Sequence, residues 1–375
     1  MRRLSLCTGV IALSVFAMLC ASFSQSLTWL GVLPGGNMSE AYAVSADGQV
    51  VVGVSLNSSN STATAFRWTA ATGMVSLGTL GGNRSYAHGV SADGSVVAGY
   101  SYDTANRVRA YRWANGVMEA LSMPSDVRWS AAYGTSADGS VVVGQLSLGQ
   151  GRLRAFRWSA DGGTVSLPLP ADATISDATA VSANGEVVVG AAGTLNRTYA
   201  VRWTPDGVED ISGGNSGIAF AVSADGRVVV GRSGTGGQVQ AFRWTPETGH
   251  VLLGTLPGGS YSEARAVSAN GSIIVGQAST ETNDYVAVRW REGVGWENLN
   301  LVYENLLAPE SLLIAAYAIS PDGRYIVGFG YNSLTDRGEA WLLDTVPEPA
   351  SVAVLMGGLC ALARRRNATA RKAIR

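Results

Sequence analysis

Few side chains in this sequence have the types and spacing that catalysis or metal binding requires. The two histidines, His88 and His250, lie far apart in the chain, and neither has a cysteine nearby. No nucleophile motif supports a Ser-His-Asp site, and no His/Cys spacing fits zinc. A glycosidase or lyase needs two acids about 5 to 10 Å apart, and the sequence singles out no such pair. We therefore expect no catalytic residues, no metal and no cofactor.

The most regular feature is a turn phrase, Ser-Ala-Asp-Gly or a close variant, that recurs seven times. Its Asp or Asn occupies positions 47, 93, 138, 184, 225, 270 and 322, with steps of 46, 45, 46, 41, 45 and 52. A period of this size indicates a repeat architecture. Asp and Asn tolerate tight turns, and the following Gly accepts positive φ. Because Asn replaces Asp in two copies, a structural turn is favoured over a ring of metal-binding aspartates.

Each repeat predicts four short strands. In the first copy these strands cover residues 41–45, 50–54, 65–68 and 74–80. The second strand, Val-Val-Val-Gly, is apolar on both faces, which predicts burial between neighbouring sheets. Its Gly is expected to allow a neighbouring backbone to approach closely. Four strands in about 45 residues are typical of one blade of a β-propeller.

The third strand carries a repeated arginine and tryptophan, as in Ala65-Phe66-Arg67-Trp68. One interpretation makes the arginines a ring that binds an anionic polymer. The favoured interpretation makes each arginine structural, paired with a carboxylate or stacked on a ring. Likewise, packing between blades is favoured over sugar stacking for the tryptophans. The six arginines of this series are Arg67, Arg112, Arg157, Arg202, Arg243 and Arg289.

The two ends of the repeat region predict how it closes. The seventh copy stops after its third strand, at residues 340–344, whereas residues 28–36 match the fourth-strand segment 251–259 in phase. A permuted split of this kind protects the edges of the end blades. We therefore predict an all-β fold, a seven-bladed β-propeller over residues 27–345 whose last blade is closed by the N-terminal strand.

The N-terminus predicts export. Two arginines, an apolar run and small residues indicate a signal peptide over residues 1–24. The alternatives are an uncleaved membrane anchor and a lipoprotein site at Cys20, which the bulky Leu19 before it disfavours. The three cysteines, Cys7, Cys20 and Cys360, all lie in the two ends, so the repeat region is expected to lack disulfides.

The C-terminus has three consecutive parts: Pro347-Glu348-Pro349, an apolar segment over residues 350–363, and Arg364-Arg365-Arg366. The apolar segment is short for a stable span but suits transient engagement of the inner membrane. This arrangement, over residues 346–366, resembles the PEP-CTERM sorting signal of Gram-negative bacteria. The resemblance implies an exosortase-type processing enzyme as a partner, cleavage near Pro347-Glu348-Pro349, and delivery to the cell surface. Residues 367–375 form a basic tail beyond the usual end of such signals, expected in the cytoplasm.

The repeats also resemble a known family. The order Leu-Gly-Thr-Leu-Gly-Gly, Ser-Tyr-Ala-His-Gly-Val-Ser-Ala-Asp-Gly and Ala-Tyr-Arg-Trp within residues 77–113 is similar to the extracellular HAF-repeat family. The His that often begins the family's His-Ala-Phe is replaced here by Thr64 and Arg109. The resemblance implies an extracellular repeat protein and transfers no activity to particular residues.

Charge narrows the choice of partner. Eight of the 27 basic residues but only one of the 28 acidic residues lie in the two ends, so the repeat region is acidic. This disfavours nucleic acid as a partner. We expect a surface or matrix protein that binds exopolysaccharide or envelope proteins, with a purely structural matrix component or a polysaccharide hydrolase or lyase as alternatives.

One insertion is a candidate ligand loop. The longest repeat interval, 52 residues, adds the segment 296–313. Trp296, Tyr303 and Glu304 are its candidate ligand-facing residues. The alternative is that this segment seals the last blade.

Overall fold

The computed structural model describes residues 25–57, 62–235 and 238–345. The predicted signal peptide and the predicted sorting residues Pro347, Glu348, Pro349, Arg364, Arg365 and Arg366 lie outside the described residues. Residues Leu27–Asp344 form one compact unit. Within the described ranges, no helix is both long enough and apolar enough to cross a membrane.

The fold is all-β, as predicted, and is built from sheets of antiparallel neighbours. One sheet has eight strands and contains two consecutive hairpin units. The first unit is β2 (Gly36–Val44), β3 (Val51–Asn57), β4 (Ala63–Thr69) and β5 (Gly73–Ser76). The second unit is β6 (Gly81–Val90), β7 (Val96–Asp103), β8 (Val108–Ala114) and β9 (Val117–Ala120). A single parallel pairing, Ala63 with Arg84, joins the two units.

Four further sheets each use four consecutive strands. The first of these is β10 (Trp129–Thr135), β11 (Val141–Ser147), β12 (Leu153–Ser159) and β13 (Gly163–Ser166). The second is β14 (Ile175–Val181), β15 (Val188–Thr194), β16 (Arg197–Thr204) and β17 (Gly207–Asp210). The third is β18 (Ser216–Val222), β19 (Val229–Thr235), β20 (Gln238–Thr245) and β21 (Gly249–Leu252). The fourth is β22 (Ser262–Val267), β23 (Ile273–Ser279), β24 (Tyr285–Arg291) and β25 (Gly295–Asn298).

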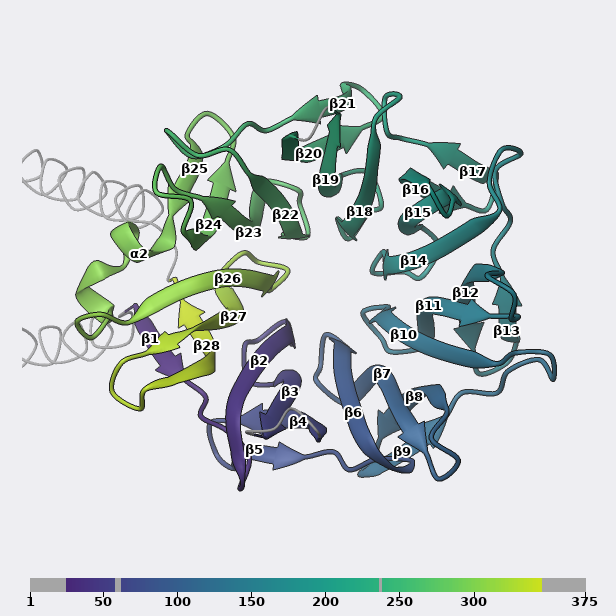
Figure 1. Cartoon of the computed structure of the whole chain (residues 1–375), viewed down its shortest axis with the longest axis horizontal. Coiled ribbons are helices and arrows are strands. Elements are labelled where there is room, and N and C mark those ends of the chain that lie inside the picture. Colours follow the sequence, from purple (N-terminus) through teal and green to yellow (C-terminus); the bar gives the residue numbers. More distant parts are fainter. Residues whose placement is uncertain (1–24, 58–61, 236–237, 346–375) are drawn as a thin grey trace, which may run out of the picture. The chain divides into compact units, whose positions relative to one another are not determined.

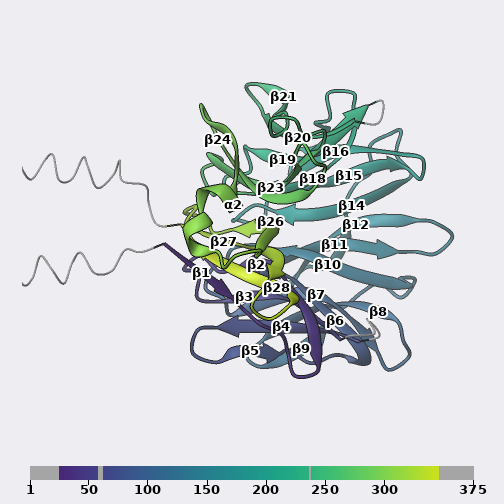
Figure 2. The ribbon, with the colours of Figure 1, turned by 60° about the vertical axis from the view of Figure 1, so that its left-hand side comes forward.

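The last sheet combines the two ends of the repeat region. It contains β26 (Leu312–Ile319), β27 (Tyr325–Asn332), β28 (Arg337–Asp344) and β1 (Ser26–Trp29), in the order β1-β28-β27-β26. Figure 2 shows β1 beside β28. Helix α2 (Leu299–Val302) and the 3-10 helix η1 (Glu304–Leu306) lie between β25 and β26. The sheets are arranged radially within the unit, and the strands nearest the centre are β2, β6, β10, β14, β18, β22 and β26 (Figure 1).

The turn phrase has the geometry that the sequence predicts. In the first copy, Asp47 Oδ1 accepts hydrogen bonds from Ser45 Oγ at 2.7 Å and from the amide of Gln49 at 3.0 Å. Gly48 has φ of 71°. The turn glycine also packs against the preceding repeat. In the second copy, for example, a Cβ at Gly94 would lie 2.5 Å from Val50. At Gly48 the corresponding neighbour is Tyr325, from the last repeat.

A β-bulge in each innermost strand follows from the Val-Val-Val-Gly pattern. In β2, Ala41 pairs with Gly53 and Ala43 pairs with Val52, so Tyr42 is the extra residue. A Cβ at Gly53 would lie 1.9 Å from the carbonyl oxygen of Glu40. The glycine therefore permits the close backbone approach that was predicted, and with it the bulge. The same register shift occurs in β6, β10, β14, β18, β22 and β26.

The repeated arginines make structural contacts of two kinds: the predicted carboxylate or ring, and a backbone carbonyl that was not predicted. Arg112, Arg157 and Arg202 each donate from Nε to the carbonyl of the turn glycine in the next repeat, at 3.1 to 3.2 Å. The predicted partners occur as well: Arg202 lies 3.6 Å from Glu209 and 5.6 Å from the centroid of Trp244. Arg289 donates to Glu297 at 3.1 Å and lies 5.9 Å from the centroid of Tyr303. Strand alternation turns the arginine toward the next sheet, where the exposed carbonyl of a tight turn is the nearest acceptor.

Candidate central binding site

The seven bulges bring seven side chains, of five different types, to one place. The bulged residue stands three positions before the Ser of the turn phrase in every repeat. A bulge re-aims the side chain of the residue that it inserts. All seven of these side chains line a single cavity of about 440 Å³, together with Glu40, Asp177 and Ile218. The bulged residues are Tyr42, His88, Tyr133, Thr179, Phe220, Arg265 and Tyr317.

Four neighbouring rings, those of Tyr317, Tyr42, His88 and Tyr133, form one side of this central cavity. Tyr42 stacks on His88 with ring centroids 4.9 Å apart and on its other side lies 5.6 Å from Tyr317. His88 also meets the edge of Tyr133 at 5.6 Å. Behind this wall, Tyr100 of β7 stacks on His88 at 5.4 Å. These contacts hold the rings in place, which favours a preformed cavity.

Arginine contacts form the opposite side of the cavity. The Arg265 guanidinium lies 4.5 Å from the centroid of Phe220 and 5.9 Å from that of Tyr317. Glu263, whose side chain is fully buried, accepts hydrogen bonds from Arg265, from Arg232 at 3.3 Å and from Tyr261 at 2.6 Å. Two arginines around one buried carboxylate leave this side of the cavity with positive charge.

Two polar atoms at the cavity have unused hydrogen-bonding capacity. Nε2 of His88 and Oδ1 of Asp177 are inaccessible to solvent and have no hydrogen-bond partner among the described residues. Leaving such an atom unpartnered costs about 1 to 3 kcal/mol, so it calls for an explanation. Because neither atom is accessible, a ligand in the cavity could complete these bonds only after a neighbouring side chain moved.

Burial also shifts the pKa values of ionisable side chains that line the cavity. Desolvation raises the pKa of Asp177 to about 6 and lowers the pKa of His88 to about 4. Burial likewise raises the pKa of Glu40, while the hydrogen bond from Tyr42 Oη at 2.9 Å opposes that shift. His88 is therefore neutral at pH 7, and Asp177 changes charge slightly below it.

The candidate loop residues of the longest repeat lie away from this cavity. Trp296 donates from Nε1 to the carbonyls of Leu253 and Gly254 at 3.1 and 3.2 Å. Tyr303 is 2% exposed, and its hydroxyl accepts a hydrogen bond from Arg289. Glu304 is exposed at the start of η1. None of the three lines the central cavity, and the two aromatic residues pack as a seal would require.

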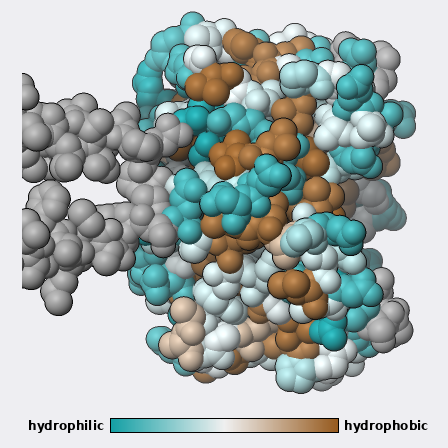
Figure 3. All heavy atoms as spheres, turned by 90° about the vertical axis from the view of Figure 1, so that its left-hand side faces the viewer, coloured by the Kyte–Doolittle hydropathy of each residue, from teal (hydrophilic) through white to brown (hydrophobic). Residues whose placement is uncertain are grey.

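The side of the unit that carries α2 is mixed in character. Hydrophobic areas lie among hydrophilic ones in this view, without one dominant apolar surface (Figure 3). Leu301 in α2 is 73% exposed and Leu334, before β28, is 78% exposed. Scattered exposed leucines of this kind are normal on a soluble surface and define no site.

The second histidine is in a different setting. His250 contacts Ser233 Oγ through Nε2 at 2.9 Å, and its Nδ1 contacts the carbonyl of Ile211 at 3.1 Å. Its ring stacks on Phe242 at 4.5 Å. In a catalytic triad, Nδ1 of the histidine contacts a carboxylate, whereas Nδ1 of His250 contacts a backbone carbonyl. This Ser-His pair therefore lacks the acid that orients the histidine of a triad. No cluster of three or more metal-ligating His, Cys, Asp or Glu side chains occurs in the part of the chain that the structure describes.

Solved structures place the fold among β-propellers. Oligogalacturonate lyase from Vibrio parahaemolyticus aligns with a TM-score of 0.54 at 14% identity, covering 86% of this chain and 94% of the lyase. The β-propeller domain of the Trilobed protease from Pyrococcus furiosus, which has an open velcro topology, aligns with a TM-score of 0.54 at 9% identity, covering 82% and 96%. At such identities the similarity defines the fold alone. No family model and no curated protein sequence matches this chain.

Proposed function

We propose that this protein is an exported cell-surface or matrix β-propeller that binds polysaccharide in its central cavity. The observation that carries the binding proposal is the convergence of seven bulged side chains on one cavity. Aromatic faces such as those of Tyr42, Tyr133 and Tyr317 suit the apolar faces of sugar rings. Export rests on the N-terminal and C-terminal sequence patterns.

The proposal includes a closed ring of seven blades. Support comes from contacts between the first and last repeats that reproduce contacts inside the chain. Leu30 donates its amide to the carbonyl of Ala340 at 2.9 Å, as Leu77 does to that of Ala65. Leu30 and Leu33 also pack with Val327 and Leu342 in one core cluster. Deleting residues 27–36 should therefore lower the melting temperature greatly, and a variant that melts like the intact protein would contradict closure.

Binding is tested by calorimetry of the full-length protein with neutral and acidic oligosaccharides. Tyr133→Ala removes one wall of the cavity and should weaken binding by about tenfold or more, equivalent to roughly 1.4 kcal/mol. Tyr331→Ala is the matched control, because Tyr331 is 36% exposed in β27 and does not line the cavity. Absence of binding at millimolar oligosaccharide, or equal binding by Tyr133→Ala, would refute the proposal.

A hydrolase or lyase acting on envelope polysaccharide is the second candidate. It is favoured by one observation: Glu40 and Asp177 line the same cavity and both have raised pKa values, that of Asp177 near 6. A carboxylic acid with such a pKa can act as a general acid near neutral pH. Turnover of polysaccharide that disappears in Asp177→Asn would establish it. Binding without release of shorter products would exclude it for the polysaccharides tested.

Sorting is tested at the C-terminus. Replacing Pro347, Glu348 and Pro349 with alanine should abolish C-terminal processing and retain the protein at the inner membrane. The measurements are the mass of the mature C-terminus and fractionation of the cell envelope. Unchanged processing together with unchanged surface delivery would contradict the proposed role of an exosortase-type enzyme.

A further inference from the structure

A second cavity adjoins the central one between the sheets that contain β7 and β10. It has a volume of about 480 Å³. Tyr133 lines both cavities. Tyr100, which lines the second, stacks on His88 in the wall of the first. If an extended polymer bound in the central cavity, its neighbouring units would therefore lie beside the second cavity, which we call the outer cavity.

The lining of this outer cavity is aromatic and cationic. Its side chains include Tyr100 and Tyr102 from β7, Trp129 from β10, and the exposed residues Arg107 and Arg128. No acidic side chain lines it. This composition stands out because acidic residues outnumber basic ones between the two ends of the chain. A local excess of positive charge on an acidic protein favours an anionic ligand.

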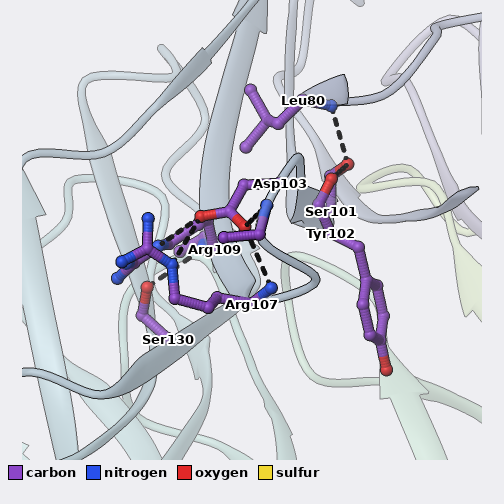
Figure 4. A network of polar contacts seen from close by, with 9 residues as sticks. Leu80, Ser101, Tyr102, Asp103, Arg107, Arg109 and Ser130 are labelled. Atoms are coloured by element: carbon purple, nitrogen blue, oxygen red, sulfur yellow. Dashed lines mark hydrogen bonds and ion pairs between the residues drawn. The ribbon is translucent and has the colours of Figure 1, made fainter. Parts of the chain in front are cut away.

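The two arginines that line the outer cavity, Arg107 and Arg128, differ in their contacts. Arg107 donates from Nε to Asp103 Oδ2 at 2.9 Å, and Arg109 donates to the same oxygen at 3.3 Å. Figure 4 shows the carboxylate of Asp103 facing the guanidinium groups of Arg107 and Arg109, with the ring of Tyr102 pointing away from them. One carboxylate facing two guanidinium groups leaves net positive charge. The side chain of Arg128 is exposed and has no ion pair or hydrogen bond within the described residues, so its five donors are open to a ligand.

We propose that the outer cavity binds a negatively charged sugar, such as a uronate, in a polysaccharide whose neighbouring unit occupies the central cavity. The inference rests on the proposed binding function and specifies its ligand class. A sugar carboxylate matches the planar fork of a guanidinium, which can donate two parallel hydrogen bonds. The rings of Tyr102 and Trp129 provide apolar surfaces for the sugar itself.

The test compares three hexasaccharides by calorimetry with the full-length protein: oligomannuronate, its methyl ester and neutral cellohexaose. The uronate should bind about tenfold more tightly than either neutral probe. Its affinity should fall as salt is raised, because these exposed charges are screened. Arg128→Gln should remove most of the preference for the uronate and leave binding of the neutral probes unchanged.

Two controls make the result specific. Arg337→Gln removes an exposed arginine of β28 that does not line the outer cavity, and it should retain the preference. Arg128→Lys should retain part of it, because the charge remains without the fork. Equal binding of uronate and neutral probes, or an Arg128→Gln variant with the full preference, would overturn the inference while leaving the central site intact. Absence of binding by all three probes would overturn both.

Discussion

The amide of Ala340 donates to Ser39 Oγ at 2.9 Å across a separation of 301 residues. Ser39 Oγ in turn donates to the carbonyl of Gly31 at 2.6 Å. The same pair of bonds recurs inside the chain, where Ala65 donates to Ser85 Oγ at 2.9 Å and Ser85 donates to Gly78 at 2.7 Å. The last repeat thus meets the first through the contact that joins consecutive repeats.

Removal of this hydroxyl should destabilise the protein measurably. Ser39→Ala leaves the buried amide of Ala340 without its acceptor, which should cost about 1 to 3 kcal/mol. Ser85→Ala removes the equivalent hydroxyl at an internal junction and should cost a similar amount. Urea unfolding of both variants measures the two losses. A clear loss for Ser85→Ala with less than about 0.5 kcal/mol for Ser39→Ala would show that the first and last repeats do not hold each other in solution.

A chain of backbone hydrogen bonds between turns has one break that the sequence explains. In each repeat but the last, the amide of the residue after the turn Ser donates to the carbonyl of the equivalent residue in the next repeat. The series begins with Ala46, which donates to Ala92 at 2.9 Å, and ends with Ala269, which donates to Pro321 at 2.9 Å. Pro321 has no amide hydrogen, so it cannot donate to the next carbonyl in the series, that of Ala46.

Pro321→Ala should supply the missing donor. A new hydrogen bond contributes about 0.5 to 1.5 kcal/mol, whereas loss of the proline costs about 0.4 to 1 kcal/mol through the unfolded chain. The net stability should therefore change little. Hydrogen exchange is the sharper measurement, and the new amide at position 321 should be as protected as that of Ala269. Rapid exchange at position 321 beside a protected Ala269 would contradict this geometry.

The sequence predicted the scaffold well because each of its rules acts locally or repeats. The turn phrase needs only Ser, Asp or Asn and Gly, and the match of residues 28–36 to 251–259 anticipated the pairing of β1 with β28. The backbone partners of the repeated arginines were harder to predict than their carboxylate and ring partners. A backbone carbonyl in the next repeat leaves no mark in the sequence, unlike a carboxylate at a fixed spacing.

The central site could not be predicted from alternation alone. A bulge adds one residue to one strand, and only the pairing register reveals that Tyr42 or His88 is that residue. A sequence signal does exist: the position three before the turn Ser changes chemistry between copies while its neighbours remain small. The length of the longest repeat led instead to the prediction of Trp296 and Tyr303 as ligand-facing residues. Repeat length alone does not distinguish the two roles, because an apolar insertion can serve packing as readily as ligand binding.

The turn aspartates should be replaceable by asparagine but not by alanine. Asp138 Oδ1 accepts from Ser136 Oγ at 2.6 Å and from the amide of Ser140 at 3.0 Å, and these bonds lower the pKa of Asp138 to about 2. Asn184 accepts the corresponding bond from Ser182 at 2.7 Å. Asp138→Asn should therefore unfold in urea like the wild type. Asp138→Ala should lose on the order of 1 kcal/mol.

A chelator provides the control for the turn prediction. Because the aspartate is assigned to the turn and not to a metal, EDTA should leave the melting temperature of the wild type unchanged. A chelator-dependent fall in melting temperature, or an Asp138→Asn variant as unstable as Asp138→Ala, would assign the turns a metal-binding role.

Two of the buried ionisable groups of the cavity, Asp177 and His88, should give opposite dependences of stability on pH. The pKa of Asp177 is raised to about 6, so the folded protein holds this proton more tightly than the unfolded chain. Its favourable contribution to the free energy of unfolding is complete below about pH 4 and is lost as the pH rises through 6. The pKa of His88 is lowered to about 4. Its favourable contribution is complete above about pH 6.5 and is lost as the pH falls toward 4.

Single variants separate these opposing effects, which partly cancel in the wild type. Asp177→Asn removes a buried charge at neutral pH, so its melting temperature relative to the wild type should rise by a few degrees between pH 4 and pH 8. His88→Gln loses ring packing at every pH, but its deficit relative to the wild type should shrink as the pH falls from 7 to 4. Thermal unfolding monitored across this range measures both differences. Differences that stay constant with pH would show that neither group titrates as its burial requires.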